Sequence, residues 1–271
     1  MSGFTNLQFA NTAAQAVDQG RHGIRALIKS HHTALNLTTR WHWQLWPDYE
    51  ARIEALKPEL EPLLRNGSLL GFFLGDELLF NGLSFVDLQA YSRAMRVAFP
   101  TAILYVNEAW PSLVPTMPGA GQFVGTLGAI PDAQLLRHVP PELDWWSVDI
   151  YPDWFSPSAL PMFYHSFLRP KMSANQSFVL VPPFYGEGST TKSGSVADCD
   201  DADCDRAMAR WADFCITWIQ GGDDDAVRIV GVMPYHWASL GNGTRARGGK
   251  ELPTARERWE EFGRAVVHKE G

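Results

Sequence analysis

Short apolar runs that favour β-strands alternate with longer amphipathic segments along most of the chain, and this alternation restricts the fold more than any other feature. Such a pattern produces parallel strands that are covered by helices. The expected strands are residues 4–9, 24–29, 70–74, 102–106, 145–150, 178–181 and 229–233. A weaker run, residues 35–41, is either an eighth strand or part of the loop after the second strand. The expected helices are residues 47–64, 85–99, 207–219 and 254–267.

Polar and aromatic residues gather where the clear strands end. The clusters are GDE at 75–77, NEAW at 107–110, DIYPD at 149–153, PFYGE at 183–187 and PYHW at 234–237. In a parallel barrel these carboxyl ends meet at one mouth, where enzymes of this fold place their sites. The alternative, an open doubly wound sheet, usually carries a Gly-rich phosphate turn, and no such turn follows a strand here. We therefore expect an α/β fold, a (β/α)8 (TIM) barrel. The sequence also allows the N-terminal part of this barrel to be incomplete or irregular.

Length and composition fit one large domain. The chain has 271 residues, of which 45% are hydrophobic and 20% charged, and barrels of this class use about 250 residues. We expect a single domain over residues 1–271, as a monomer or a weak oligomer. The formal net charge of -7 provides no basic surface for DNA or RNA, so no nucleic-acid partner is expected. No membrane partner is expected either, because no apolar run reaches the roughly 18 residues that a spanning helix needs.

Features of the sequence suggest an extracellular or secretory-pathway protein whose leader is absent from this chain. Asn-x-Ser/Thr sequons occur at Asn36, Asn66, Asn175 and Asn242. Cys199 and Cys204 flank an acidic, loop-like stretch, and no second Cys/His pair follows, which favours a local disulfide over a metal site. Cys215 lies in an apolar helical pattern and is expected to be a buried thiol.

Asp76 and Glu77 follow the almost wholly apolar run LLGFFLG. Two adjacent carboxylates at a strand end are unfavourable unless they are solvated or partnered. Because neighbouring residues of a strand point to opposite sides, one of the two should face the barrel axis while the other braces a loop or caps the following helix. The alternative is that Glu77 is only a helix-start acid, stabilised by the helix dipole.

Three further acids lie at strand ends. Alternation in WWSVDIYPD places Asp149 inward, either towards substrate or as a hydrogen-bonded structural residue. Glu187, after VLVPPFYG, and Glu108, after ILYVN, are candidates for the second carboxylate that glycoside chemistry requires. Asn107, beside Glu108, is suited to bond a sugar hydroxyl.

Eleven Trp residues are many for this length, and several stand beside the polar clusters. Aromatic faces stack on sugar rings while carboxylates and amides bond the hydroxyls, so Trp together with Asp and Glu favours a carbohydrate ligand. Most of these rings are expected in the core. Trp237 and Trp43 are the candidates for ligand contact.

At these clusters the sequence resembles the clan A glycoside hydrolases, a superfamily of (β/α)8 barrels. GFFLGDEL is similar to their fourth strand, which typically ends in Asn-Glu or Asp-Glu with Glu as the acid/base. DWWSVDIYPD resembles the sixth strand, VLVPPFYGE the seventh and VGVMPYHW the eighth, so the similarity covers about residues 70 to 240.

The resemblance implies hydrolysis of a poly- or oligosaccharide without a cofactor or metal. Glu77 becomes the general acid/base, and the nucleophile at the end of the seventh strand falls near Glu187. If ILYVNEA is the fourth strand instead, Glu108 takes the acid/base role. The residues expected to bond the nucleophile or substrate hydroxyls are Tyr151, Tyr185 and His236.

Two other functions are compatible with the sequence. A barrel that binds glycans without cleaving them is favoured by the position of Glu187, several residues beyond its strand. A metal-dependent hydrolase is the other, since His residues occur near acids, although His-x-His after a first strand is absent.

Overall fold

The computed structural model describes residues 6–39, 42–113, 130–149, 159–182, 185–187, 201–221, 228–233, 246–248 and 253–267. The chain divides into two compact units. The first contains the described residues up to Val148 together with Ser166–Ser177, and the second contains Asp149–His165 and the described residues from Phe178 onward.

The first unit is built on parallel strands that neighbour one another in chain order. They are β1 (Leu7–Ala10), β2 (Arg25–Lys29), β5 (Leu69–Asp76), β6 (Ile103–Ala109) and β7 (Trp145–Asp149). Most side chains of β2, β5, β6 and β7 are buried on both faces, as parallel strands covered by helices require. On one face the rings of Phe9, Phe73 and Tyr105 contact one another, with centroids 4.6 to 6.4 Å apart. We call this the inner face.

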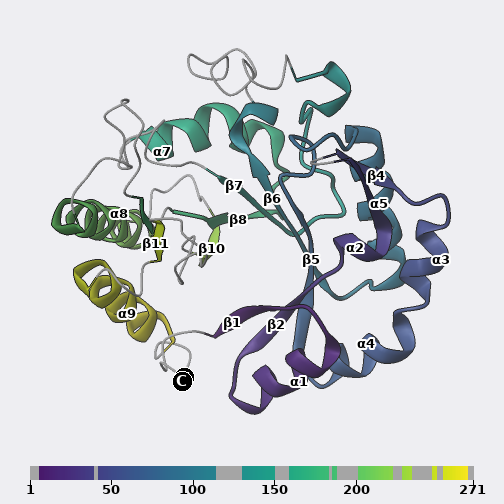
Figure 1. Cartoon of the computed structure of the whole chain (residues 1–271), viewed down its shortest axis with the longest axis horizontal. Helices are drawn as coiled ribbons and strands as arrows, with labels where there is room; N and C mark the ends of the chain where they lie inside the picture. The colour runs from purple at the N-terminus through teal and green to yellow at the C-terminus, as the bar shows by residue number, and fades with distance from the viewer. Residues whose placement is uncertain are drawn as a thin grey trace. The chain divides into compact units, whose positions relative to one another are not determined.

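Helices cover the other face of these strands, as Figure 1 shows for α1 (Ala13–Arg21), α4 (Lys57–Arg65) and α5 (Phe85–Ala98). Phe72, one position before the inner Phe73, packs on Phe99 at the end of α5, with ring centroids 4.6 Å apart. The hydroxyl of Ser84 caps α5 by accepting from the Asp87 N–H.

The expected helix 47–64 is two helices, α3 (Tyr49–Glu54) and α4, and that prediction is corrected here. Pro58 stands at the start of α4, where its missing N–H is harmless, but it disfavours a helical residue before it. The chain therefore breaks between the two helices.

The weak run at 35–41 does not add a strand to the parallel sheet. A short helix, α2 (His31–Ala34), precedes β3 (Leu35–Thr39), which pairs in antiparallel fashion with β4 (His42–Leu45). A two-stranded hairpin therefore follows β2.

The second unit contains the later helices and strands, apart from Ser177 of β8, which belongs to the first unit. They are α7 (Ala159–Phe163), β8 (Ser177–Leu180), β9 (Tyr185–Glu187), α8 (Asp201–Gly221), β10 (Ile229–Val232), β11 (Ala246–Gly248) and α9 (Pro253–Val267). β8 and β10 are parallel, and β9 and β11 are antiparallel. α8 and α9 lie side by side (Figure 1). The side chain of Asp205 in α8 accepts from the N–H groups of Thr254 and Ala255, and so caps the start of α9.

Seven parallel strands are described across the two units, together with covering helices. The predicted (β/α)8 barrel is therefore confirmed as an incomplete barrel. No helix among the described residues is long and apolar enough to span a bilayer. Cys215 is a buried free thiol, as expected. Cys199 and the side chain of Cys204 lie outside the described residues, and the disulfide between them stays a prediction.

Candidate active site

An irregularity near the carboxyl end of β5 changes the direction in which its acidic residues point. Phe73 pairs with Tyr105, but Gly75 pairs with Val106 and Asp76 with Asn107, so β5 has one residue more than β6 over this stretch. Such a bulge redirects the side chains that follow it. Without it, alternation from Phe73 would place Asp76 on the helix-covered face; with it, Asp76 shares the inner face with Asn107.

A chain of hydrogen bonds runs along the inner face and ends on Asp76. The Tyr105 hydroxyl lies 2.6 Å from that of Ser147, and Ser147 donates to Asn107 Oδ1 at 2.5 Å. Asn107 Nδ2 then donates to Asp76 Oδ1 at 2.7 Å. Because Ser147 gives its proton to Asn107, Tyr105 must donate to Ser147, and the chain is directed at the carboxylate.

Asp76 is exposed to solvent although protein surrounds it on most sides. Loss of hydration raises the pKa of this carboxyl group, against the lowering by the Asn107 amide and by the charge of Lys29. One Asp76 oxygen is fixed by Asn107, and the residue is accessible to a ligand. This is an arrangement that suits binding of a sugar hydroxyl.

Glu77 adopts a left-handed backbone conformation with φ of 50°. This conformation is uncommon for a residue with a side chain, and such residues gather at functional sites. The Glu77 N–H donates to the Asn107 carbonyl at 2.8 Å, and its own carbonyl accepts from the Asn81 N–H at 2.8 Å. The side chain is half-buried, so part of it is open to solvent.

Glu108 is in a different environment, with no exposed surface. Its Oε2 accepts from the Leu79 N–H at 2.9 Å. Its Oε1 accepts from the N–H groups of Phe80 and Ala109, at 3.1 and 2.9 Å, and from the Ser112 hydroxyl at 3.1 Å. Burial raises the pKa of Glu108 to about 7, although all four hydrogen bonds act to lower it. The structure therefore places this carboxylate inside the protein, away from solvent.

A cluster of nitrogen-bearing and aromatic side chains follows β2. Lys29 is exposed, and its Nζ lies 5.6 Å from the centroid of the Phe9 ring. The rings of His31 and His32 are 4.0 Å apart and lie 5.6 and 5.7 Å from Trp43. Burial, and then the charges of His32 and Lys29, lower the pKa of His31 to about 4, so this imidazole is neutral at neutral pH.

Other predicted site residues are described only in part. Asp149 ends β7 and is buried, with 5% of its surface exposed. Tyr185 and Glu187 lie in β9, where Glu187 pairs with Ala246 of β11, but their side chains are outside the described residues. The predicted site residues Tyr151, His236 and Trp237 also lie outside them, and their roles stay predictions.

The structure thus brings together Asp76, Glu77 and Asn107. Sequence reasoning missed three polar residues around them, namely Lys29, Tyr105 and Ser147. Two could have been found by alternation, because Tyr105 and Ser147 each stand two residues before a predicted site residue in the same strand.

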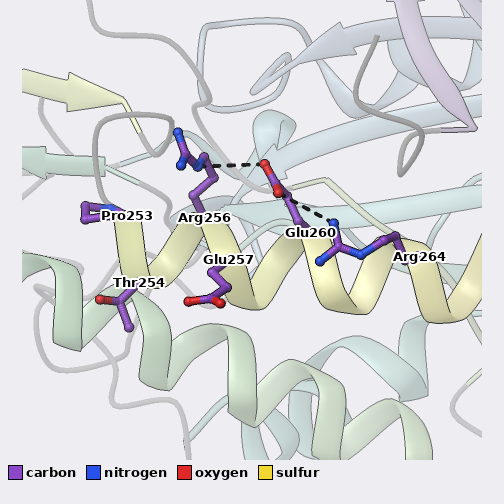
Figure 2. Close-up of a pocket in the computed structure, with 6 residues that line it drawn as sticks. All are labelled: Pro253, Thr254, Arg256, Glu257, Glu260 and Arg264. Carbon is purple, nitrogen blue, oxygen red and sulfur yellow. Dashed lines mark ion pairs between the residues drawn. The ribbon is translucent and has the colours of Figure 1, made fainter.

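Two other kinds of site were considered in the described part of the chain, a metal centre and a pocket on α9. No group of three or more His, Cys, Asp or Glu residues there is placed to hold a metal ion. Figure 2 shows a pocket of about 440 Å³ that is lined by Pro253, Thr254, Arg256, Glu257, Glu260 and Arg264. Glu260 pairs with Arg256 and Arg264 at 3.7 and 3.6 Å, and no aromatic ring is among these residues to receive a sugar.

Comparisons with known proteins give a result at the level of the fold. No protein-family model matches the sequence, and no curated protein matches it. A fungal β-1,4-galactanase structure aligns with a TM-score of 0.55 and 13% identity, over 93% of this chain and 87% of that chain. A thermostable mutant of a xylanase from Cellvibrio japonicus aligns with a TM-score of 0.56 and 11% identity, over 93% and 82%.

Larger glycosidases share the same likeness. The β-D-glucuronidase of Dictyoglomus thermophilum aligns with a TM-score of 0.56 and 10% identity, over 96% of this chain and 45% of that chain. This chain spans only 27% of the Bacteroides uniformis β-glucuronidase. These neighbours are clan A glycoside hydrolases, and at such identities the likeness concerns the fold. The resemblance drawn from the strand-end motifs is confirmed at that level.

Proposed function

We propose that this chain is a glycoside hydrolase that cleaves a poly- or oligosaccharide, with Glu77 as its general acid/base. The observation that carries the proposal is the pair Asp76–Glu77 at the carboxyl end of β5, where a bulge and a left-handed residue leave both side chains accessible. In barrels of this fold that end of the strands holds the site. The glycosidase fold of the structural neighbours supports the same reading.

Glu77 is preferred to Glu108 because a general acid must reach the glycosidic oxygen, within about 3 Å. Glu108 has no exposed surface, and both of its oxygens are held by protein donors. The strand count is compatible with this choice. If β10 is the eighth strand, counting back along the neighbouring strands makes β5 the fourth.

In the proposed reaction Glu77 gives its proton to the glycosidic oxygen, and the leaving alcohol departs with the electrons of the broken C–O bond. Glu187 is the proposed second carboxylate. In an inverting reaction it takes one proton from the water that attacks the anomeric carbon, and the other proton of that water stays on the new sugar hydroxyl. In a retaining reaction it attacks the anomeric carbon itself, and the water that later releases the sugar from it gives one proton back to Glu77. Asp76 and Asn107 bond ring hydroxyls, and Trp43 stacks on a sugar face.

Hydrolysis of a panel of plant, algal and fungal polysaccharides tests this proposal. The wild type is compared with Glu77→Gln, Glu187→Gln and Glu59→Gln, the last being a control on the exposed side of α4. We expect Glu77→Gln to lower kcat by about 10²- to 10⁴-fold, the usual contribution of acid/base catalysis, and Glu59→Gln to keep full activity. Binding of a glycan without cleavage by the wild type would replace the hydrolase with a glycan-binding barrel.

A further inference from the structure

Glu108 is the common acceptor for two segments of the chain. Its carboxylate accepts from the N–H groups of Leu79 and Phe80 in the loop after β5, from the N–H of Ala109 at the end of its own strand, and from the hydroxyl of Ser112 in the turn that follows. Leu79 and Ser112 have no exposed surface, so water cannot take over their hydrogen bonds. The turn at 109–112 and the loop after β5 are therefore joined through one buried side chain.

The loop that Glu108 holds, residues 77–83, carries the proposed acid. Its backbone closes on itself, because Asn81 N–H donates to Glu77 and Leu83 N–H donates to Leu78. The loop also contacts the β3–β4 hairpin, because the Trp43 N–H donates to the Asn81 carbonyl at 2.8 Å. A change in the position of this loop would therefore move Glu77 and the backbone of Trp43 together.

We propose that Glu108 is a positioning residue, whose buried carboxylate holds residues 77–83 and through them sets the places of Glu77 and Trp43. The catalytic half of this inference rests on the proposed function of Glu77. The structural half, the hold on the loop, stands independently of any activity.

The geometry requires two accepting oxygens at position 108, which an amide does not offer. Four donors meet two oxygens, and an amide would turn an NH₂ group towards one or more of these N–H donors. Within β6, Glu108 is also one residue from Asn107 on the inner face, and therefore lies on the opposite face. Its donors and its direction both assign it to the loop rather than to a substrate.

Amide hydrogen exchange tests the structural half. We expect Glu108→Gln to speed exchange at Leu79 and Phe80 about tenfold or more, because these two amides lose a buried acceptor, and a tenfold change corresponds to about 1.4 kcal/mol. Asp205→Asn is the matched control, since Asp205 is also buried and also accepts two backbone N–H groups, at the start of α9. It should leave these two amides unchanged. Should Glu108→Gln fail to fold, Glu108→Asp gives the same test, because its shorter side chain cannot reach both loop amides.

A double-mutant cycle tests the catalytic half. We expect Glu108→Gln to lower kcat about tenfold on a glycan, and far less on an aryl glycoside whose good leaving group needs no proton. In a Glu77→Gln background the same change should have no further effect on this difference between substrates. A purely structural role would lower both rates equally, in proportion to the folded fraction.

Three results separate the possibilities. Unchanged exchange at Leu79 and Phe80 overturns the inference. So does a full additional loss of glycan cleavage in the double variant, which would make Glu108 act independently of Glu77. If the wild type cleaves no glycan, the proposed function fails, and the exchange experiment alone decides whether Glu108 holds the loop.

Discussion

β5 and β6 are neighbours, and each ends in a polar residue followed by glutamate, yet the two pairs have opposite environments. At the end of β5, Asp76 is exposed and Glu77 is half-buried. At the end of β6, Asn107 and Glu108 keep only 6% and 0% of their surface exposed. A polar residue followed by glutamate is thus accessible to a ligand at the end of one strand and buried inside the protein at the end of the next.

Backbone geometry, rather than residue type, produces this difference. β5 gains a residue between Phe73 and Gly75, and Glu77 then takes a left-handed conformation. β6 runs on regularly, so Glu108 keeps the direction that alternation dictates. A motif of two residues therefore does not identify a catalytic carboxylate until the path of its strand is known.

The largest expected difference between the two strands is in stability. Glu108→Ala leaves three backbone N–H groups without their acceptor, so the free energy of unfolding should fall by about 4 kcal/mol. Glu77→Ala should lower it by less than about 1 kcal/mol, because the side chain is only half-buried. Urea unfolding of both variants measures this, and equal losses would remove the contrast.

A second prediction concerns pH. The folded state holds the Glu108 proton up to a pKa of about 7, against an ordinary value of 4.5 in the unfolded chain. The folded state therefore binds more protons between these values, and its stability should fall as pH rises from about 4.5 to about 7, by no more than about 3 kcal/mol. Glu108→Gln cannot titrate, so the wild-type minus variant difference in unfolding free energy should show this slope. A flat difference from pH 4 to pH 8 would contradict it.

A substitution in the bulge, Gly75→Ala, is expected to lower the stability by a smaller amount. Gly75 has φ of 157°, and a Cβ there would lie 2.5 Å from Leu78 Cδ2, in the buried core. Gly75→Ala should therefore cost about 2 kcal/mol of stability and displace Asp76 and Glu77, which lowers glycan cleavage. Thermal unfolding and the hydrolysis assay check both parts. Full activity in this variant would show that the bulge does not place the acids.

The smallest expected effect is that of Ser147→Ala. It breaks the hydrogen-bond chain between Tyr105 and Asn107 but leaves the bond from Asn107 to Asp76. We expect a loss of about 1 kcal/mol in unfolding free energy and less than a tenfold loss in kcat/KM. Asp76→Asn, which removes the acceptor at the end of the chain, should lower kcat/KM more than Ser147→Ala.

Much of the fold was predictable from the sequence, because apolar strands and amphipathic helices have different periods. The predictions failed where local backbone chemistry or strand pairing outweighed the periodicity of apolar residues. Pro58 divides the helix expected at 47–64, and the residues after Leu35 pair with β4 instead of entering the sheet.

The candidate site was predictable only as a set of neighbours. Parallel strand ends share an edge, so Asp76, Glu77 and Asn107 were expected together. The inward turn of Asp76 was not predictable, because a bulge leaves no mark in the periodicity. The burial of Glu108 could have been read from its alternation with Val106, which lies on the covered face.

Carboxyl labelling tests the central claim most directly, that the acids of β5 and not that of β6 meet the substrate. The native chain is treated with a water-soluble carbodiimide and an amine, with and without a bound glycan, and labelled residues are located by peptide mass spectrometry. We predict labelling of Asp76 and Glu77, slowed by the glycan, and labelling of Glu108 only after unfolding. Labelling of Glu108 in the native chain that the glycan slows, with Glu77 unaffected, would contradict the claim.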